Sequence, residues 1–154
     1  MNIFYVHEDP EVAARMLCDK HVVKMTLETA QILSTVLGGP YRPTHARHPS
    51  VLWAADNLPW VMRHFKALLA EYTFRYGHQH KSGEILPTLT EKAATAQPKA
   101  FTPPPLCMPE IYHRPDPVEA YRTYYATDKA SIARWERNRP APEWFTARIS
   151  LQSV

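Results

Sequence analysis

Four ionisable side chains lie within nine residues of the chain, at Lys20, His21, Lys24 and Glu28. At about 100° per residue they fall on one narrow stripe of a helix predicted over residues 20–37. Lys20, Lys24 and Glu28 are spaced four residues apart, so two ammonium groups and a carboxylate stack along one face. His21 lies near enough to join a proton-transfer network at neutral pH. This ionisable stripe therefore offers an amine, a carboxylate and a proton carrier, which are groups used in nucleophilic and acid–base catalysis.

Apolar residues occupy the larger arc of the same predicted helix. A surface helix normally has an apolar stripe on a polar background, so we expect the helix over residues 20–37 to be central and the most buried. Charges buried without partners cost too much free energy to keep. The ionisable stripe should therefore form the floor of a cleft. The alternative is a helix with two ordinary salt bridges and a satisfied core histidine at His21.

Capping signals divide the rest of the chain into helices. Asp9-Pro10 and Asp116-Pro117 each place an N-cap carboxylate before a proline at the first helical position. The second of these pairs opens a helix predicted through residue 135. Gly38-Gly39-Pro40 is a strong terminator for the central helix. We predict an all-α fold in which residues 1–154 form a single compact domain of about five helices around the central buried helix.

Residues 40–50, PYRPTHARHPS, are predicted to be a basic loop between helices. The loop holds four basic side chains, Arg42, His45, Arg47 and His48. Ser50 is the predicted N-cap of the helix that follows. Free backbone N–H groups and nearby cations make this loop a candidate phosphate site. The alternative is a solvated connector.

A long helix is also predicted over residues 60–77, and it carries a second polar stripe. The members of that stripe are His64, Glu71, Arg75 and His78. This stripe either shares a cleft with the ionisable stripe or is a solvated face. Residues 98–117 are rich in proline and cannot form regular structure. Their apolar residues, such as Leu106 and Ile111, favour an ordered strap over the core rather than a mobile lid.

The composition is typical of a globular protein, with 45% hydrophobic and 21% charged residues. The sequence has no run of eighteen apolar residues and no signal-peptide pattern, so we expect a cytoplasmic protein without membrane association. Two cysteines are too few for a disulfide framework. A net charge of +3 permits an anionic partner without demanding one.

We expect no metal and no cofactor. Cys18 and His21 are three residues apart, but the other histidines occur as HARH and HQH, without established zinc spacing. The sequence has no glycine-rich phosphate loop, no GxSxG and no CxxC. Nucleotide hydrolysis through such a loop, serine-hydrolase chemistry and dithiol redox chemistry therefore have no support.

Several stretches together resemble a family found in phage genomes and scattered bacteria. They are IFYVHEDP, CDKHVVKM followed by LETAQILST, PTHARHPSVLW, EYTFRYGHQHKS, DPVEAYRTYY and PEWF, and they span nearly the whole chain. This family is labelled pyrimidine dimer DNA glycosylase or endonuclease V-like, and related glycosylases act in defence against phages with modified bases. The phage endonuclease V uses the α-amino group of an N-terminal threonine as nucleophile, which Met1-Asn2-Ile3 does not match. The resemblance implies a DNA-binding enzyme, and we expect a monomer without an obligatory protein partner.

Base excision suits the predicted cleft. Cleavage of an N-glycosidic bond passes through an oxocarbenium-like state that a carboxylate stabilises, and Glu28 is the candidate. Lys20 or Lys24 either forms a Schiff base with the sugar or binds the flanking phosphates; we expect phosphate binding, because Glu28 should keep Lys24 charged. The predicted catalytic residues are Glu28, Lys24, Lys20 and His21. The predicted DNA-binding residues are Arg42, His45, Arg47, His48, Ser50, Trp53, Arg75, Tyr76 and His78.

A flipped base would need an aromatic partner, and Trp60 and Trp144 are further candidates for that contact. Two other functions fit the same residues: a hydrolase or transferase acting on free nucleotides or nucleosides, and a non-enzymatic helical nucleic-acid-binding module. Salt-sensitive DNA binding would favour the glycosylase over the nucleotide enzyme. Unchanged stability on loss of Lys24 or Glu28 would count against the binding module, in which the ionisable stripe is a salt-bridge network.

Overall fold

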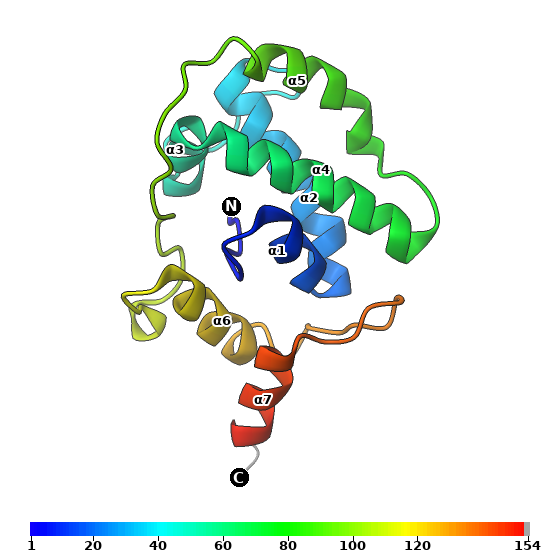
Figure 1. The fold of residues 1–154 in the computed structure, drawn as a ribbon, viewed down its shortest axis with the longest axis vertical. Helices are drawn as coiled ribbons and strands as arrows, with labels where there is room; N and C mark the ends of the chain where they lie inside the picture. Colours follow the sequence, from blue (N-terminus) through cyan, green and yellow to red (C-terminus); the bar gives the residue numbers. More distant parts are fainter. Residues whose placement is uncertain (153–154) are drawn as a thin grey trace.

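The computed structural model describes residues 1–152, and within that range it confirms the predicted all-α single domain (Figure 1). These residues form seven α-helices and two short 3-10 helices, with no strand. Three of the α-helices have only seven or eight residues, shorter than the window over which periodicity is informative. The elements are α1 (Pro10–Met16), α2 (Asp19–Leu37), α3 (Pro49–Asp56), α4 (Leu58–Tyr76), η1 (Lys81–Ile85), α5 (Leu86–Ala93), η2 (Glu110–Tyr112), α6 (Pro117–Thr127) and α7 (Glu143–Gln152).

Local capping chemistry sets several helix ends, as predicted. The Asp9 carboxylate accepts a hydrogen bond from the N–H of Glu11 at 2.8 Å and begins α1. The Asp116 carboxylate accepts one from the N–H of Val118 at 3.0 Å and begins α6. Gly38 ends α2 with a φ of +86°, a left-handed conformation that glycine adopts without a Cβ clash.

Two helix ends differ from the sequence prediction. The N-cap of α3 is His48, whose Nδ1 accepts a hydrogen bond from the N–H of Ser50 at 3.1 Å, so Ser50 lies inside the helix rather than at its cap. Helix α6 ends at Thr127 instead of continuing to residue 135. A tertiary contact holds the chain after α6 away from the helix path, because the carbonyl of Arg134 accepts a hydrogen bond from the N–H of Asp19 at 2.9 Å.

Helix α2 packs against α3, α4 and α5, while α1 packs across α4 and α6 packs against α7. The N-terminus lies near the centre of the view in Figure 1, between α4 and α6. Residues 3–6 are buried there without forming a strand. One face of α2 remains in water, because Lys20, Val23, Lys24 and Leu27 are exposed. The first half of α2 is therefore buried on one side and open on the other.

The proline-rich segment lies against the core and the N-terminal residues. The carbonyl of Thr102 accepts a hydrogen bond from Trp53 Nε1 at 2.8 Å, and the N–H of Thr102 donates to Asn57 Oδ1 at 2.9 Å. Further along, the carbonyl of Cys107 accepts a hydrogen bond from Asn2 Nδ2 at 2.9 Å. These bonds tie the segment to α3 and to the residue next to Met1.

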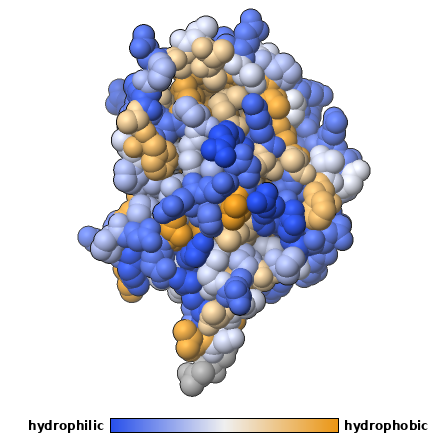
Figure 2. All heavy atoms as spheres, viewed as in Figure 1, coloured by the Kyte–Doolittle hydropathy of each residue, from blue (hydrophilic) through white to orange (hydrophobic). Residues whose placement is uncertain are grey.

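The surface in Figure 2 is a mixture of hydrophilic and hydrophobic residues, with the hydrophobic ones in scattered patches over the face in view. Such scattered apolar residues are usual on folded proteins. Among residues 1–152, no helix has both the length and the apolar character needed to cross a membrane.

Candidate active site

The Glu28 carboxylate lies between the first residue and the exposed face of α2. Its Oε1 is 3.6 Å from the nitrogen of Met1, and its Oε2 is 3.9 Å from Nζ of Lys24. The Glu28 side chain is 14% exposed, and within residues 1–152 its buried Oε2 has no hydrogen-bond partner. The carboxylate is therefore held near two nitrogens while one oxygen keeps its full capacity to accept a hydrogen bond.

The basic loop reaches the same place through His48. Burial lowers the pKa of His48, the Met1 amine and His45 act in the same direction, and the Glu28 carboxylate opposes them. His48 is half-buried and caps α3, so it is a fixed neighbour of this carboxylate. Ser50 does not join it, because its side chain is buried and its Oγ lies 3.4 Å from Sγ of Cys107. The predicted phosphate contact at Ser50 is thus contradicted.

An open groove of about 720 Å³ runs between α2 and the loop. Thr35 Oγ1 accepts a hydrogen bond from the N–H of Thr44 at 3.0 Å and fixes the loop beside the helix. Leu27 and Gln31 line the helix side of the groove, and Arg42 lines the loop side. Since Gln31 is three residues after Glu28, the groove and the carboxylate occupy neighbouring parts of one helix face.

The exposed cations predicted for DNA binding lie in water on both sides of Glu28. Lys24 is 67% exposed, and Lys20, Arg42, His45 and Arg47 are also exposed. These side chains are therefore accessible to an anionic ligand from solvent. The roles assigned to them remain predictions.

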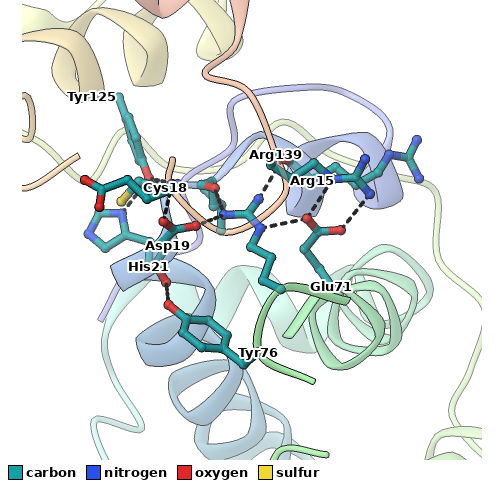
Figure 3. Close-up of polar contacts among 11 residues, drawn as sticks. Arg15, Cys18, Asp19, His21, Glu71, Tyr76, Tyr125 and Arg139 are labelled. Atoms are coloured by element: carbon teal, nitrogen blue, oxygen red, sulfur yellow. Dashed lines mark hydrogen bonds and ion pairs between the residues drawn. The ribbon is translucent and has the colours of Figure 1, made fainter. Parts of the chain in front are cut away.

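His21 lies in the core rather than in the site. Its ring stacks on Phe4 with centroids 4.4 Å apart. Its Nδ1 lies 2.9 Å from the Tyr125 hydroxyl, and both residues are labelled in Figure 3. Burial, helped by the charges of Lys129, Lys24 and Lys20, lowers its pKa to about 4. A proton carrier at neutral pH needs a pKa near 7. The structure therefore contradicts that role for His21 and favours the core-histidine alternative.

Arg75 belongs to a buried ion network that Figure 3 shows in close-up. Its side chain is 0% exposed, with Nη1 3.1 Å from Asp19 Oδ1 and Nε 2.7 Å from Glu71 Oε2. Arg139 Nε lies 2.9 Å from the same Glu71 oxygen. Burial raises the pKa of Glu71, but hydrogen bonds from Arg139 and Arg75 outweigh it and lower the pKa overall. Arg75 cannot reach a phosphate, so its predicted DNA contact is wrong, and this part of the second stripe is not a solvated face.

The buried tryptophans are core residues. Trp53 and Trp60 are 6% and 7% exposed, and the indole N–H of Trp60 donates to the carbonyl of Glu8 at 2.8 Å. Most of each ring is covered by the core, although Trp60 lines a cavity with Tyr5 and Phe101, so the stacking role of the two tryptophans stays a prediction. Trp144 is half-buried, with its indole N–H directed at the sulfur of Met16.

Tyr76 and His78 lie beside the first turn of α2. The Tyr76 hydroxyl donates to the carbonyl of Asp19 at 3.2 Å, and its ring stacks on Tyr72 with centroids 5.0 Å apart. His78 is exposed, and its Nε2 lies 2.9 Å from the Tyr72 hydroxyl. Tyr76 thus lines a groove with Lys20 rather than the groove beside Gln31, and His78 is among the lining residues of neither.

The site also contains a group that the sequence prediction did not include, the nitrogen of Met1 beside Glu28. Only the tertiary fold brings the first residue to the middle of α2, so no local pattern could have identified it. Within residues 1–152, no three His, Cys, Asp or Glu side chains are grouped so that they could hold a metal ion.

The sequence model of one known family, described as pyrimidine dimer DNA glycosylase, matches residues 1–83. The chain belongs to this family. The pyrimidine dimer DNA glycosylase match includes α1 to α4 and thus Glu28, the basic loop and the groove between them. It confirms the family suggested by the sequence motifs and connects the chain to DNA glycosylase chemistry and DNA repair. Comparison with curated proteins and with solved structures finds no match.

Proposed function

We propose that this protein is a DNA glycosylase that flips a damaged or hypermodified base out of the duplex and excises it, with Glu28 as the catalytic carboxylate. The observation that carries the proposal is the state of Glu28, a mostly buried carboxylate that has an oxygen without a hydrogen-bond partner in residues 1–152. A carboxylate that is fixed in a mostly buried site stabilises an oxocarbenium-like sugar more than a solvated carboxylate does. The reason is that little solvent must reorganise during the reaction.

The surroundings of Glu28 fit a nucleic-acid substrate. Cations from α2 and from the loop flank the carboxylate, so phosphates on both sides of the target nucleotide have partners. The groove of about 720 Å³ beside Leu27 and Gln31 is large enough for a nucleobase and lies along the same helix face. We assign the flipped base to this groove, where Gln31 offers an amide for hydrogen bonds to the base edge.

A base-release assay tests this function. Duplexes that carry a single pyrimidine dimer, and phage DNAs that carry modified bases, are incubated with the protein, and new abasic sites are counted with an aldehyde-reactive probe. We expect abasic sites on at least one of these DNAs and none on unmodified DNA. Absence of abasic sites from all of them, together with hydrolysis of free nucleosides, would support the nucleotide-enzyme alternative instead.

Strand cleavage after base removal is a second candidate activity, and one observation favours it. The nitrogen of Met1 lies 3.6 Å from Glu28 Oε1, where the structure has it as an ammonium group, and loss of one proton makes such a group a primary amine. Such an amine can condense with the C1′ aldehyde of an abasic sugar, releasing water and forming an imine from which the 3′ phosphate is eliminated. Met1 is thus a better candidate for the imine than Lys24, which is 67% exposed and hence solvated.

Borohydride trapping tests the second activity. Reduction of the imine should give a covalent protein–DNA adduct that mass spectrometry places on the peptide containing Met1. A version with two extra residues before Met1 should form no adduct, whereas Lys24→Ala should form it at the wild-type level. An adduct on Lys20 or Lys24 would assign the imine to a lysine, and the absence of any adduct would leave base excision without strand cleavage.

A further inference from the structure

A group of basic residues surrounds the first turns of α2, and it joins two lysines of the site described above to arginines from a later part of the chain. Lys20 and Lys24 of α2, with Arg134 and Arg137 from the segment after α6, line an open groove of about 610 Å³. Both arginines are exposed. Two parts of the chain more than a hundred residues apart thus present cations at one place.

The segment that carries the arginines is hydrogen-bonded to the start of α2. The backbone N–H of Asp19 donates to the carbonyl of Arg134 at 2.9 Å, and Asp19 Oδ2 accepts from the N–H of Glu136 at 2.7 Å. The other oxygen of Asp19 is paired with buried Arg75 at 3.1 Å. Asp19, which belongs to the buried ion network of Figure 3, therefore connects that network to the backbone of the segment with the exposed arginines.

The side chains of the arginines have free donors toward water. The guanidinium of Arg137 lies 4.9 Å from the centroid of the Tyr76 ring, and a guanidinium stacked on an aromatic face keeps its in-plane N–H groups for hydrogen bonds. Arg134 uses Nη1 on the carbonyl of Ala133 at 2.8 Å, which leaves other donors of its fork. Planar, multidentate donors of this kind suit phosphate.

Acidic groups do not cancel this charge. Two acids line the groove, Asp19 and Glu136. Asp19 is 8% exposed and its carboxylate is already paired with Arg75. Glu136 is exposed and is the remaining negative charge among the lining residues, against four cations. The groove therefore carries a net positive charge and is complementary to a polyanion.

We propose that Arg134 and Arg137, together with Lys20 and Lys24, bind the DNA backbone on one side of the target nucleotide. This inference rests on the proposed function, because it takes Glu28 as the position of the excised base. Eight residues of α2 separate Lys20 from Glu28, which is about 12 Å along the helix. That length equals about three to four nucleotide steps of a duplex strand. The basic loop with Arg42 serves phosphates on the other side.

The proposal adds a contribution from the second half of the chain. Residues 129–137 lie outside residues 1–83, which the family model matches. The matched part thus supplies the carboxylate, the groove and one set of cations, and the segment after α6 supplies the other set. We call residues 129–137, which carry Arg134 and Arg137, the arm. DNA binding through the arm should be independent of base sequence, because phosphates carry no sequence information.

Salt-dependent DNA binding tests the arm. Fluorescence anisotropy gives the affinity of the full chain for a 24-base-pair duplex between about 50 and 200 mM KCl. Each phosphate contact contributes about 0.9 to the slope of log affinity against log salt, so Arg134→Gln with Arg137→Gln should lower the slope by about 1.8. Over this fourfold range of salt, the double variant should therefore lose about tenfold less affinity than the wild type.

Two matched variants serve as controls. Lys66→Gln with Lys92→Gln removes two charges from exposed positions of α4 and α5 and should leave the slope within about 0.5 of the wild type. Glu136→Lys adds a cation to the groove and should steepen the slope by about one to two units. Because a misfolded protein would not gain phosphate contacts, this gain does not depend on the folding of the arginine variant.

The outcomes separate the arm from the proposed function. The DNA-binding role of the arm would be overturned if the arginine variant keeps the wild-type salt slope. It would also be overturned if the slope falls equally in the lysine control. Either result would hold even if the wild type excises bases. A slope that responds as expected while the wild type releases no base from any tested DNA would support a phosphate-binding surface and overturn the glycosylase proposal.

Discussion

Replacing Glu28 by glutamine should nearly abolish base release without unfolding the protein. The amide keeps the size of the side chain and part of its hydrogen bonding, but it removes the negative charge. A unit positive charge about 4 Å from a carboxylate gains about 4 kcal/mol at an effective dielectric constant of about 20. The oxocarbenium-like state carries an incomplete charge, so the loss should be about 3 to 4 kcal/mol, or on the order of 10² to 10³ in rate.

The effect on stability should be small. Glu28 is 14% exposed, and its partners lie at 3.6 and 3.9 Å, both longer than a hydrogen bond. The pair with Lys24, which is 67% exposed, contributes about 0 to 1 kcal/mol, and the glutamine amide still offers an oxygen acceptor to the Met1 nitrogen. The unfolding midpoint in urea should therefore change little, and DNA affinity should be equal to or higher than that of the wild type, because a negative charge near the phosphates is gone.

The assay is single-turnover base release with protein in excess, so that chemistry is measured apart from product release. Glu11→Gln is the matched control, because Glu11 of α1 forms an exposed ion pair with Arg63 of α4 at 2.7 Å. It should keep the wild-type rate. A Glu28→Gln variant that also keeps the wild-type rate would refute the catalytic role of the Glu28 carboxylate. Asp19 or Glu71 could then be the catalytic carboxylate only if its buried ion pair with Arg75 opened.

Three further predictions follow from the described contacts. Lys24→Ala should lower the salt slope of DNA binding by about one unit and leave single-turnover base release within about tenfold, because the Lys24 ammonium is exposed; a loss of rate as large as that of Glu28→Gln would assign it a chemical role. Arg75→Ala should cost about 3 to 5 kcal/mol in urea unfolding, because it leaves the buried carboxylate of Glu71 short of a partner; a cost under about 1 kcal/mol would show that the network is solvated. Burial lowers the pKa of His64 in the folded protein to about 4, so the unfolded chain binds a proton at this histidine at higher pH than the folded protein does. The free energy of unfolding should therefore fall by up to about 3 kcal/mol as pH drops from about 6.5 to 4. Urea unfolding at several pH values should show a shallower fall for His64→Gln, and an equal fall would contradict this origin.

Local chemistry could be predicted from the sequence where the cause is local. The Asp9 and Asp116 caps and the Gly38 terminator depend on side chains within a few residues of the helix end, and all three were correct. The N-cap of α3 was misassigned because a serine is the more frequent cap, whereas here the ring nitrogen of His48 accepts the same N–H.

Tertiary partners could not be predicted in the same way. A polar stripe at helical spacing is compatible with water or with buried counter-charges, and only the position of Asp19 and Arg139 decides that Arg75 is buried. For the same reason, helical spacing cannot show that Phe4 and Tyr125, which are distant in sequence, enclose His21.

The prediction for Glu28 depends on the pattern of a whole helix rather than on a local cap or a tertiary partner. It rested on the large apolar arc of α2, which implies a helix that is buried on most sides and has a narrow polar face. The structure places Lys20 and Lys24 on that face in water and Glu28 at its edge, only 14% exposed. The arginines of the segment after α6 were missed because a helix was expected through residue 135, and a continuous helix would have carried them away from α2.

The role of Glu28 is tested most directly by counting abasic sites on a duplex that carries one pyrimidine dimer, with the wild type and with Glu28→Gln in parallel. We expect abasic sites at the dimer with the wild type and a rate on the order of 10² to 10³ lower with the variant. Equal rates for the two proteins would contradict the central claim that the Glu28 carboxylate drives base excision.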